Sequence, residues 1–208
     1  MPAMRFFMSA SLALLTMALP VLASAAESGE ATPTEANAPA DRLGPLAPDA
    51  ERLTHLFTSL QKEPSTERAR SLANEIREIQ SSSRSATIDM LMGNADKAIQ
   101  DKQYGAAFDF LDQVTLIAPD YAEGWNKRAT THLLMGNFAK AMIDLAKALS
   151  IEPRHLGALT SLATILKQNG RDAEALQALE SYLAIYPADR DAQKKALDLS
   201  DSLAGQKI

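Results

Sequence analysis

The side chains that most often carry chemistry are scarce in this sequence. Its 208 residues include no Cys and three His, namely His55, His132 and His155. These histidines lie far apart, and none shares the i, i+4 spacing by which one helix offers two ligands to zinc. Motifs for an activated serine, a phosphate loop, a dinucleotide fold or a carboxylate pair are also missing. The sequence therefore predicts no enzyme, no cofactor and no metal site.

The net charge of the chain limits the classes of partner that it is expected to bind. The formal net charge is −5, with 46% apolar and 23% charged residues, as in an ordinary soluble protein. Nucleic acids and anionic membranes attract basic surfaces, so an acidic chain disfavours both as the main partner. A protein or peptide is the partner that these observations favour.

The elements that must position any binding residues follow a 34-residue period. Identical residues recur in three ungapped blocks, 88–121, 122–155 and 156–189, and such a period is typical of helical-hairpin repeats. The recurring sets are Pro119, Pro153 and Pro187; Ala95, Ala129 and Ala163; Ala107, Ala141 and Ala175; Leu111, Leu145 and Leu179; and Ile117, Ile151 and Ile185.

These blocks resemble the tetratricopeptide repeat (TPR) family. The middle block matches the family pattern of aromatic, small, turn-glycine and proline positions most fully. Its matching residues are Trp125, Ala129, Gly136, Phe138, Ala141, Leu145, Ala148 and Pro153. The first block departs from the pattern, since Lys102 occupies the turn-glycine position. The resemblance implies an all-α, right-handed solenoid of helical hairpins.

The repeated residues also make physical sense as helices. Paired alanines allow two helices to approach closely, and Gly136 and Gly170 can adopt the left-handed conformation that ends a helix. Asp120 and Asp189 each precede an expected helix as N-caps. The periodicity predicts helices over 88–101, 104–117, 122–135, 138–151, 156–169 and 172–185.

Further helices are expected on both sides of the repeats. Apolar spacing predicts helices over 49–62 and 65–82, and we interpret 49–87 as a degenerate repeat at the N-terminal end of the stack. The segment 190–208 has the mixed polar and apolar pattern of a capping helix and tail. A solenoid needs such a cap because its terminal face would otherwise be apolar and wet.

A solenoid of this type binds partners along the groove formed by the first helix of each repeat. The groove is expected to run from an acidic end to a basic end, with Lys194 and Lys195 beyond it, or else to be a solvated surface without a ligand. The family members that bind a C-terminal carboxylate are disfavoured here because Asp89 and Asp96 would repel it. The expected groove residues are Asp89, Met92, Asp96, Glu123, Asn126, Lys127, Thr130, Thr160, Thr164 and Lys167.

Arg128 and Asn94 stand where the repeat pattern favours a large apolar residue. A charge on a packing face costs several kcal/mol unless it is paired, so we predict a structural ion pair for Arg128. His132 and His155 are expected to be packing and loop residues.

The N-terminal 48 residues predict export. Residues 1–25 combine Arg5, an apolar run and an Ala23-Ser24-Ala25 site, which indicates a signal peptide cut after Ala25. An alternative is an uncleaved membrane anchor over 6–26. Residues 26–48 are rich in Ala, Pro and Glu and read as a disordered tether. The mature chain is therefore expected in the periplasm or outside the cell, without membrane insertion.

Three functions fit these expectations. The first is a non-catalytic scaffold or adaptor of the bacterial envelope that binds a protein or peptide in its groove. The second is a structural protein that self-associates into a homo-oligomer, through an end of the stack or through the Trp125 region. The third is an accessory subunit of an envelope assembly enzyme. The chain also resembles exported TPR proteins of alphaproteobacteria that have no assigned activity.

Overall fold

The computed structural model describes residues 47–205, which form nine helices and no strand. The expected signal peptide and most of the expected tether, residues 1–46, lie outside this range, as do residues 206–208. Ala47 and Pro48, which we assigned to the tether, begin the first helix. The helices are α1 (Ala47–Lys62), α2 (Thr66–Ser81), α3 (Ala86–Gln100), α4 (Tyr104–Ile117), α5 (Ala122–Leu134), α6 (Phe138–Ile151), α7 (Leu156–Gln168), α8 (Asp172–Ile185) and α9 (Arg190–Gly205).

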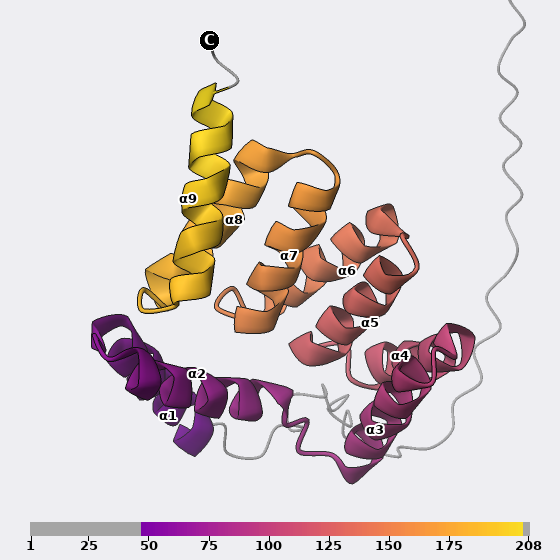
Figure 1. The fold of residues 1–208 in the computed structure, drawn as a ribbon. Helices are drawn as coiled ribbons and strands as arrows, with labels where there is room; N and C mark the ends of the chain where they lie inside the picture. The colour runs from indigo at the N-terminus through magenta and orange to yellow at the C-terminus, as the bar shows by residue number, and fades with distance from the viewer. Residues whose placement is uncertain (1–46, 206–208) are drawn as a thin grey trace, which may run out of the picture. The chain divides into compact units, whose positions relative to one another are not determined.

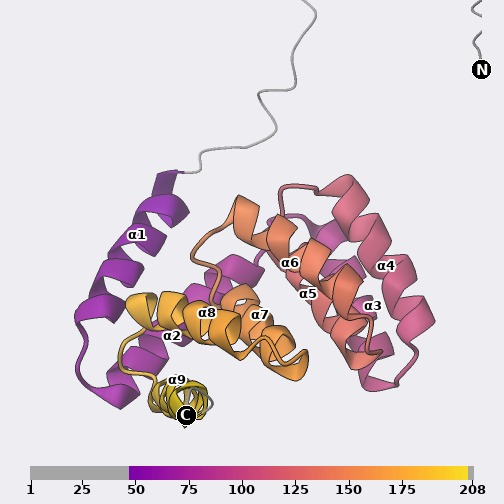
Figure 2. The same cartoon turned by 90° about the horizontal axis from the view of Figure 1, so that it is seen from above.

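Three helical hairpins pack in chain order, as the 34-residue period predicted. The hairpins are α3–α4, α5–α6 and α7–α8, and α9 packs against α8 at the C-terminal end (Figures 1 and 2). The alanine positions that were expected to bring helices together are at most 5% exposed. The all-α repeat fold is confirmed, and the six repeat helices begin and end within two residues of their expected bounds.

The turn inside each repeat has one backbone form. Gly136 and Gly170 adopt φ of 71° and 69°, and Lys102 adopts φ of 58° at the same position. In each turn the next residue donates its N–H to the carbonyl five positions back, from Gln103 to Ala98 O at 2.8 Å in the first repeat. The repeat geometry therefore imposes a left-handed conformation on a residue with a side chain, which is strained there.

One of the two expected helix caps is present. The Asp189 carboxylate accepts from the N–H groups of Asp191 and Ala192 at 3.1 and 3.0 Å, so Asp189 caps α9. Asp120 does not cap α5, because Tyr121 occupies the N-cap position and makes no side-chain cap bond.

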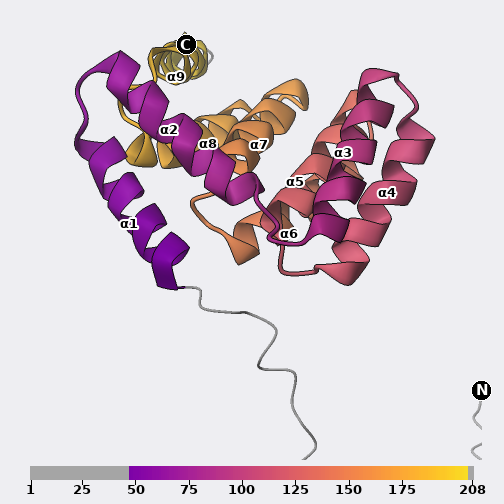
Figure 3. The same ribbon diagram turned by 90° about the horizontal axis from the view of Figure 1, so that it is seen from below.

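The α1–α2 hairpin lies elsewhere than a stacked repeat would. The degenerate-repeat interpretation of 49–87 placed it before α3, yet α1 packs on α8, and α2 packs on α5 and α7. Figure 3 shows α2 passing the ends of α7 and α5 before the chain reaches α3. The N-terminal hairpin thus joins the last repeat rather than extending the stack from the first.

Side chains of the hairpin and its connecting loop account for this position. Leu60 and Ile76 are fully buried in a core shared with α7, α8 and α9, and the Arg154 guanidinium lies 4.3 Å from the Phe57 ring centre. Arg84 adopts φ of 57° in the loop before α3, which redirects the chain. No helix within residues 47–205 is long and apolar enough to cross a membrane.

Candidate partner-binding groove

The expected groove residues on α3 do not share one environment. Asp89 is exposed and accepts a 2.5 Å hydrogen bond from the Ser83 hydroxyl, beside the α2–α3 loop. Met92 is only 8% exposed and packs in the core between α3 and α4. We expected Met92 in the groove, but its burial among apolar residues of α3 and α4 leaves little of its side chain exposed to a partner. Asp96 accepts from Lys127 Nζ on α5 at 2.7 Å.

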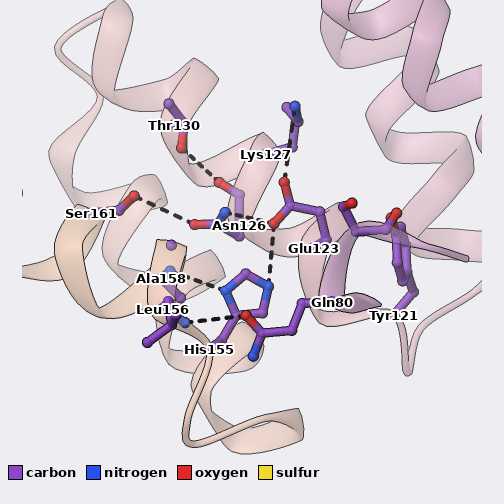
Figure 4. Close-up of polar contacts among 12 residues, drawn as sticks. Gln80, Tyr121, Glu123, Asn126, Lys127, Thr130, His155, Leu156, Ala158 and Ser161 are labelled. Carbon is purple, nitrogen blue, oxygen red and sulfur yellow. Dashed lines mark hydrogen bonds and ion pairs between the residues drawn. The ribbon is translucent and has the colours of Figure 1, made fainter. Parts of the chain in front are cut away.

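The expected residues on α5 form a partly buried polar cluster (Figure 4). Asn126 Nδ2 donates to Glu123 Oε2 at 2.8 Å, and Lys127 Nζ lies 3.9 Å from Glu123 Oε1. Asn126 is 8% exposed, so its amide is engaged within the fold. Thr130 is half-buried and donates to Asn126 O on its own helix. We call Glu123, Asn126 and Lys127, with His155, the Glu123 cluster.

His155 joins this cluster from the start of α7. Its Nδ1 accepts from the Ala158 N–H at 3.1 Å, so His155 is the N-cap of α7. A neutral ring that accepts at Nδ1 carries its proton on Nε2, and this atom lies 3.2 Å from Glu123 Oε2. Burial alone would raise the pKa of Glu123, but His155, Asn126 and the charge of Lys127 together hold it below its ordinary value.

The end of α2 covers the Glu123 cluster. The Gln80 amide donates to Arg154 O at 3.1 Å and accepts from the Leu156 N–H at 3.4 Å, on both sides of His155. The Tyr121 hydroxyl donates to Ser81 O. Arg77 and Gln80 also border a cleft over Glu123 and Asn126. The end of α2 thus covers part of the central groove and borders the cleft that remains there.

The expected residues on α7 surround an open cavity. Thr160, Thr164 and Lys167 line a space of about 620 Å³ bounded by α7, α8, α9 and one residue of α2. We call it the α7–α9 cavity. Its apolar residues are Ala163, Leu179, Ala192 and Leu199, and its charged residues are Arg77, Lys167, Asp189, Asp191, Lys195 and Asp198.

Sequence reasoning missed the residues that close this cavity. Tyr182 is 1% exposed; its hydroxyl donates to Asp189 Oδ2 at 2.7 Å and accepts from Arg77 Nη2 at 3.4 Å. Burial, followed by the carboxylate of Asp189, raises the pKa of Tyr182 above its ordinary value. Arg77 comes from α2, which ends 75 residues before α7 begins, so no local pattern could place it here.

Comparison with known proteins agrees with this geometry. A tetratricopeptide repeat family model matches residues 132–197. A TPR repeat-containing protein of Rhizobium etli is 46% identical over 177 residues, covering 85% of this chain and 87% of the relative. The chain belongs to the TPR family.

Solved TPR domains share the fold at low identity. The Sgt2 TPR domain from Aspergillus fumigatus superposes with a TM-score of 0.55 at 22% identity, covering 59% of this chain and 83% of that one. The first TPR of Spaghetti (RPAP3), bound to the HSP90 peptide SRMEEVD, gives 0.54 at 19% identity, covering 57% and 96%. Repeats of this family generally mediate protein–protein interactions, and this TPR protein is consistent with a binding scaffold.

The unusual arginine of the second TPR is paired, as predicted. Arg128 donates to both oxygens of Asp144, from Nε at 2.9 Å and from Nη2 at 2.7 Å. Its Nη1 donates to Asp112 at 2.8 Å, and the guanidinium lies 4.6 Å from the centre of Trp125. Asp144 is 3% exposed, so this pair takes the place of an apolar contact between α5 and α6 within the second repeat.

His132 is a packing residue of the same TPR. Its ring lies 4.3 Å from that of Phe108, and burial lowers the pKa of His132. Within residues 47–205, no group of three His, Asp or Glu residues is arranged to hold a metal ion.

Proposed function

We propose that this protein is a non-catalytic scaffold of the bacterial cell envelope that binds a peptide segment of a protein partner in the α7–α9 cavity. One observation carries the proposal: three expected groove residues, Thr160, Thr164 and Lys167, gather with cap residues around an open space of about 620 Å³. The central groove is an unfavourable site by comparison, because the end of α2 is bonded across it through Gln80 and Ser81 and leaves a smaller cleft over Glu123 and Asn126.

The chemistry of the cavity favours a peptide over a small ion. Its floor is apolar, with Ala163, Ala192 and Leu199, and it could receive one or two apolar side chains of a segment. Both charge signs occur at its rim, so the segment should carry both. A TPR neighbour of similar fold was solved with a peptide, which supports this mode of binding.

The envelope location rests on residues 1–25. Their basic start, apolar run and small-residue site support export and cleavage. Mass spectrometry of the protein isolated from the envelope fraction should give an N-terminus at Ala26. Retention of Met1 in the membrane fraction would support the uncleaved anchor and contradict this part of the proposal.

Site-specific photocrosslinking tests the cavity. A benzoylphenylalanine at Thr164 in the host bacterium should capture one defined protein segment, which peptide-level mass spectrometry maps. The same probe at Lys147, an exposed α6 residue outside the cavity, is the matched control and should not capture that segment.

A synthetic peptide with the mapped sequence then allows a quantitative test. Thr164→Trp should fill the cavity and weaken peptide binding by at least about tenfold, whereas Lys147→Trp should leave it unchanged. Equal capture at Thr164 and Lys147, or equal binding by both Trp variants, would remove the α7–α9 cavity as the binding site.

A further inference from the structure

The arginines of this protein fall into two groups. Residues 47–205 contain nine arginines, and six of them have a carboxylate oxygen within 4.0 Å of a guanidinium nitrogen. These six are Arg52, Arg68, Arg84, Arg128, Arg154 and Arg171. Arg70, Arg77 and Arg190 have no carboxylate of residues 47–205 within that distance. A guanidinium without a carboxylate partner can offer its N–H donors to an anion from another molecule.

These three arginines border one cleft, although they come from two distant helices. Arg70 and Arg77 lie on α2, and Arg190 begins α9, whose start lies beside α2 (Figures 1 and 3). The space between them is about 240 Å³, and all three residues are exposed. Asn74 and Tyr186 add neutral polar groups to its wall. We call this space the arginine cleft.

The carboxylates of the chain leave the arginine cleft with an excess of positive charge. Asp189 and Asp191 also border it. Both oxygens of Asp189 are already engaged, Oδ1 by two N–H groups of α9 and Oδ2 by the Tyr182 hydroxyl. Arg77 reaches Asp189 only through that hydroxyl, to which it donates at 3.4 Å. Three guanidinium groups therefore face two carboxylates, one of which is held by hydrogen bonds within the fold.

The arginine cleft adjoins the α7–α9 cavity. Arg77, Asp189 and Asp191 border both spaces, so the two are continuous at these residues. The cavity offers apolar surface at Ala163 and Leu199, and the cleft offers guanidinium groups. A segment with an apolar side chain in the cavity would therefore place a neighbouring residue beside Arg77.

We propose that the arginine cleft binds carboxylate groups of the same partner segment whose apolar side chain enters the α7–α9 cavity. This inference rests on the proposed function and adds an acidic group next to the apolar residue of the segment. Arginine suits this role because its planar fork donates two parallel N–H bonds to one carboxylate. The net charge of the whole chain is −5, so attraction of an acidic segment must come from these local cations.

None of the three arginines belongs to a repeat. Arg70 and Arg77 precede the first repeat, and Arg190 follows the third. The repulsion of a carboxylate that we expect from Asp89 and Asp96 concerns α3, whereas this cleft lies between α2 and α9. Because its cations come from both sides of the repeat array, the 34-residue pattern gave no sign of it.

Matched peptides test the arginine cleft. The probes are the acetylated, amidated peptide Gly-Leu-Leu-Glu-Glu-Gly and its counterpart with Gln in place of Glu. Each is titrated, to about 5 mM, into the isotope-labelled chain that follows the expected cut after Ala25, and binding is measured by NMR. The Glu peptide should bind about fivefold more tightly and shift the amide signals of Asn74 and Arg190. About 0.5 M salt should remove most of this preference, because exposed charges are screened.

Arginine variants locate the effect. Arg77→Gln should reduce the preference for the Glu peptide to about twofold or less, and the double variant Arg70→Gln/Arg190→Gln should do the same. All three positions are exposed, so these variants should remain folded. Arg68→Gln is the matched control, because Arg68 lies on α2 with its side chain 74% exposed and borders neither space. It should keep the full preference.

A third probe distinguishes the source of the carboxylate. The Gln peptide with an unblocked C-terminus carries a carboxylate only at its chain end. If it binds more tightly than its amidated form, and Arg77→Gln abolishes the gain, the cleft binds a chain end. Equal affinity of the amidated Glu and Gln peptides together with no gain from the unblocked end would overturn the proposal. Preferences unchanged by Arg77→Gln, or no binding of any probe, would also overturn it.

Thr164→Trp separates this proposal from the proposed function. If the Glu and Gln peptides bind equally and Thr164→Trp weakens both, the cavity binds the segment and the arginine cleft does not. If the preference for the Glu peptide survives Thr164→Trp at unchanged affinity, the cleft binds carboxylates and the cavity is not the binding site. Loss of affinity in both Thr164→Trp and Arg77→Gln is the result expected when both proposals hold.

Discussion

The first and third repeats follow the same 34-residue pattern but have different surroundings. The third repeat, α7–α8, is packed on by α6, by α9 and by the α1–α2 hairpin. The first repeat, α3–α4, has a neighbour on the α5 side and an open face at Met90 and Lys97. Lys97 and Ile165 occupy equivalent positions, one solvated and one fully buried. In this protein, whether a given repeat position is buried depends on which helices pack against that repeat.

The strongest test of this difference is to replace the side chain at the same position of both repeats with alanine. Ile165→Ala should lower the free energy of unfolding by about 3 kcal/mol, because it removes buried methyl groups and leaves a cavity. Lys97→Ala, at an exposed helix position, should change it by less than about 0.5 kcal/mol.

Urea unfolding followed by circular dichroism measures both values. If the two substitutions cost the same, the third repeat is no better covered than the first, and the contrast between them is wrong.

The features that the sequence predicts correctly are those that depend on contacts within a repeat or between neighbouring repeats. Helix positions, the paired alanines and the capping helix depend on contacts within a repeat or between adjacent repeats, and a periodic pattern records such contacts directly. The expected groove positions Thr160, Thr164 and Lys167 lie together around the α7–α9 cavity for this reason, and their role in binding stays a prediction. The ion pair of Arg128 was also predictable, since a charge in an apolar column must find a partner.

The position of the α1–α2 hairpin could not be predicted in this way. Its contacts with α7 and α8 join segments about 75 to 120 residues apart, such as Gln80 with Leu156 and Gln61 with Ala184. An amphipathic hairpin presents the same apolar face whichever repeat it covers. The burial of Met92 was missed for a related reason, because the repeat pattern does not show how much of each expected groove position its neighbours cover.

Removing the hydrogen bonds of Gln80 should affect the third repeat and not the first, with a smaller loss of stability than Ile165→Ala. Gln80→Ala removes a donor to Arg154 O and an acceptor from the Leu156 N–H, so we expect a loss of about 1–2 kcal/mol. Hydrogen exchange should rise at the end of α2 and the first turn of α7 but not in α3 or α4.

Gln113→Ala is the matched control, because the Gln113 amide donates only to Asp109 O on its own helix. Increased exchange throughout α3 and α4 after Gln80→Ala would mean that the hairpin supports the whole stack.

The turn of the first repeat offers a gain of stability. Lys102 adopts φ of 58° where Gly136 and Gly170 stand in the other repeats. Lys102→Gly should raise the free energy of unfolding by about 1 kcal/mol, because glycine takes this conformation without strain.

Gly136→Ala should cost a similar amount in the second repeat, by the converse effect. Thermal unfolding of the two variants gives both signs, and a destabilised Lys102→Gly would mean that the Lys102 side chain contributes more than its backbone strain costs.

The smallest expected effect is a pH dependence that belongs to the Glu123 cluster. The pKa of Glu123 lies below its ordinary value of 4.5, so this carboxylate stabilises the fold above that pH, and the contribution is lost as the pH falls through the lowered pKa. The charged group beside it is Lys127, with Asp96 beyond Lys127, and the neutral His155 ring lies 3.2 Å away. Glu123→Gln should be less stable at pH 7 and lose less stability between about pH 5 and 3. Urea titrations at each pH measure the difference. Parallel curves would show that the cluster holds α5, α7 and the end of α2 together by shape and neutral hydrogen bonds, without a contribution from the charge of Glu123.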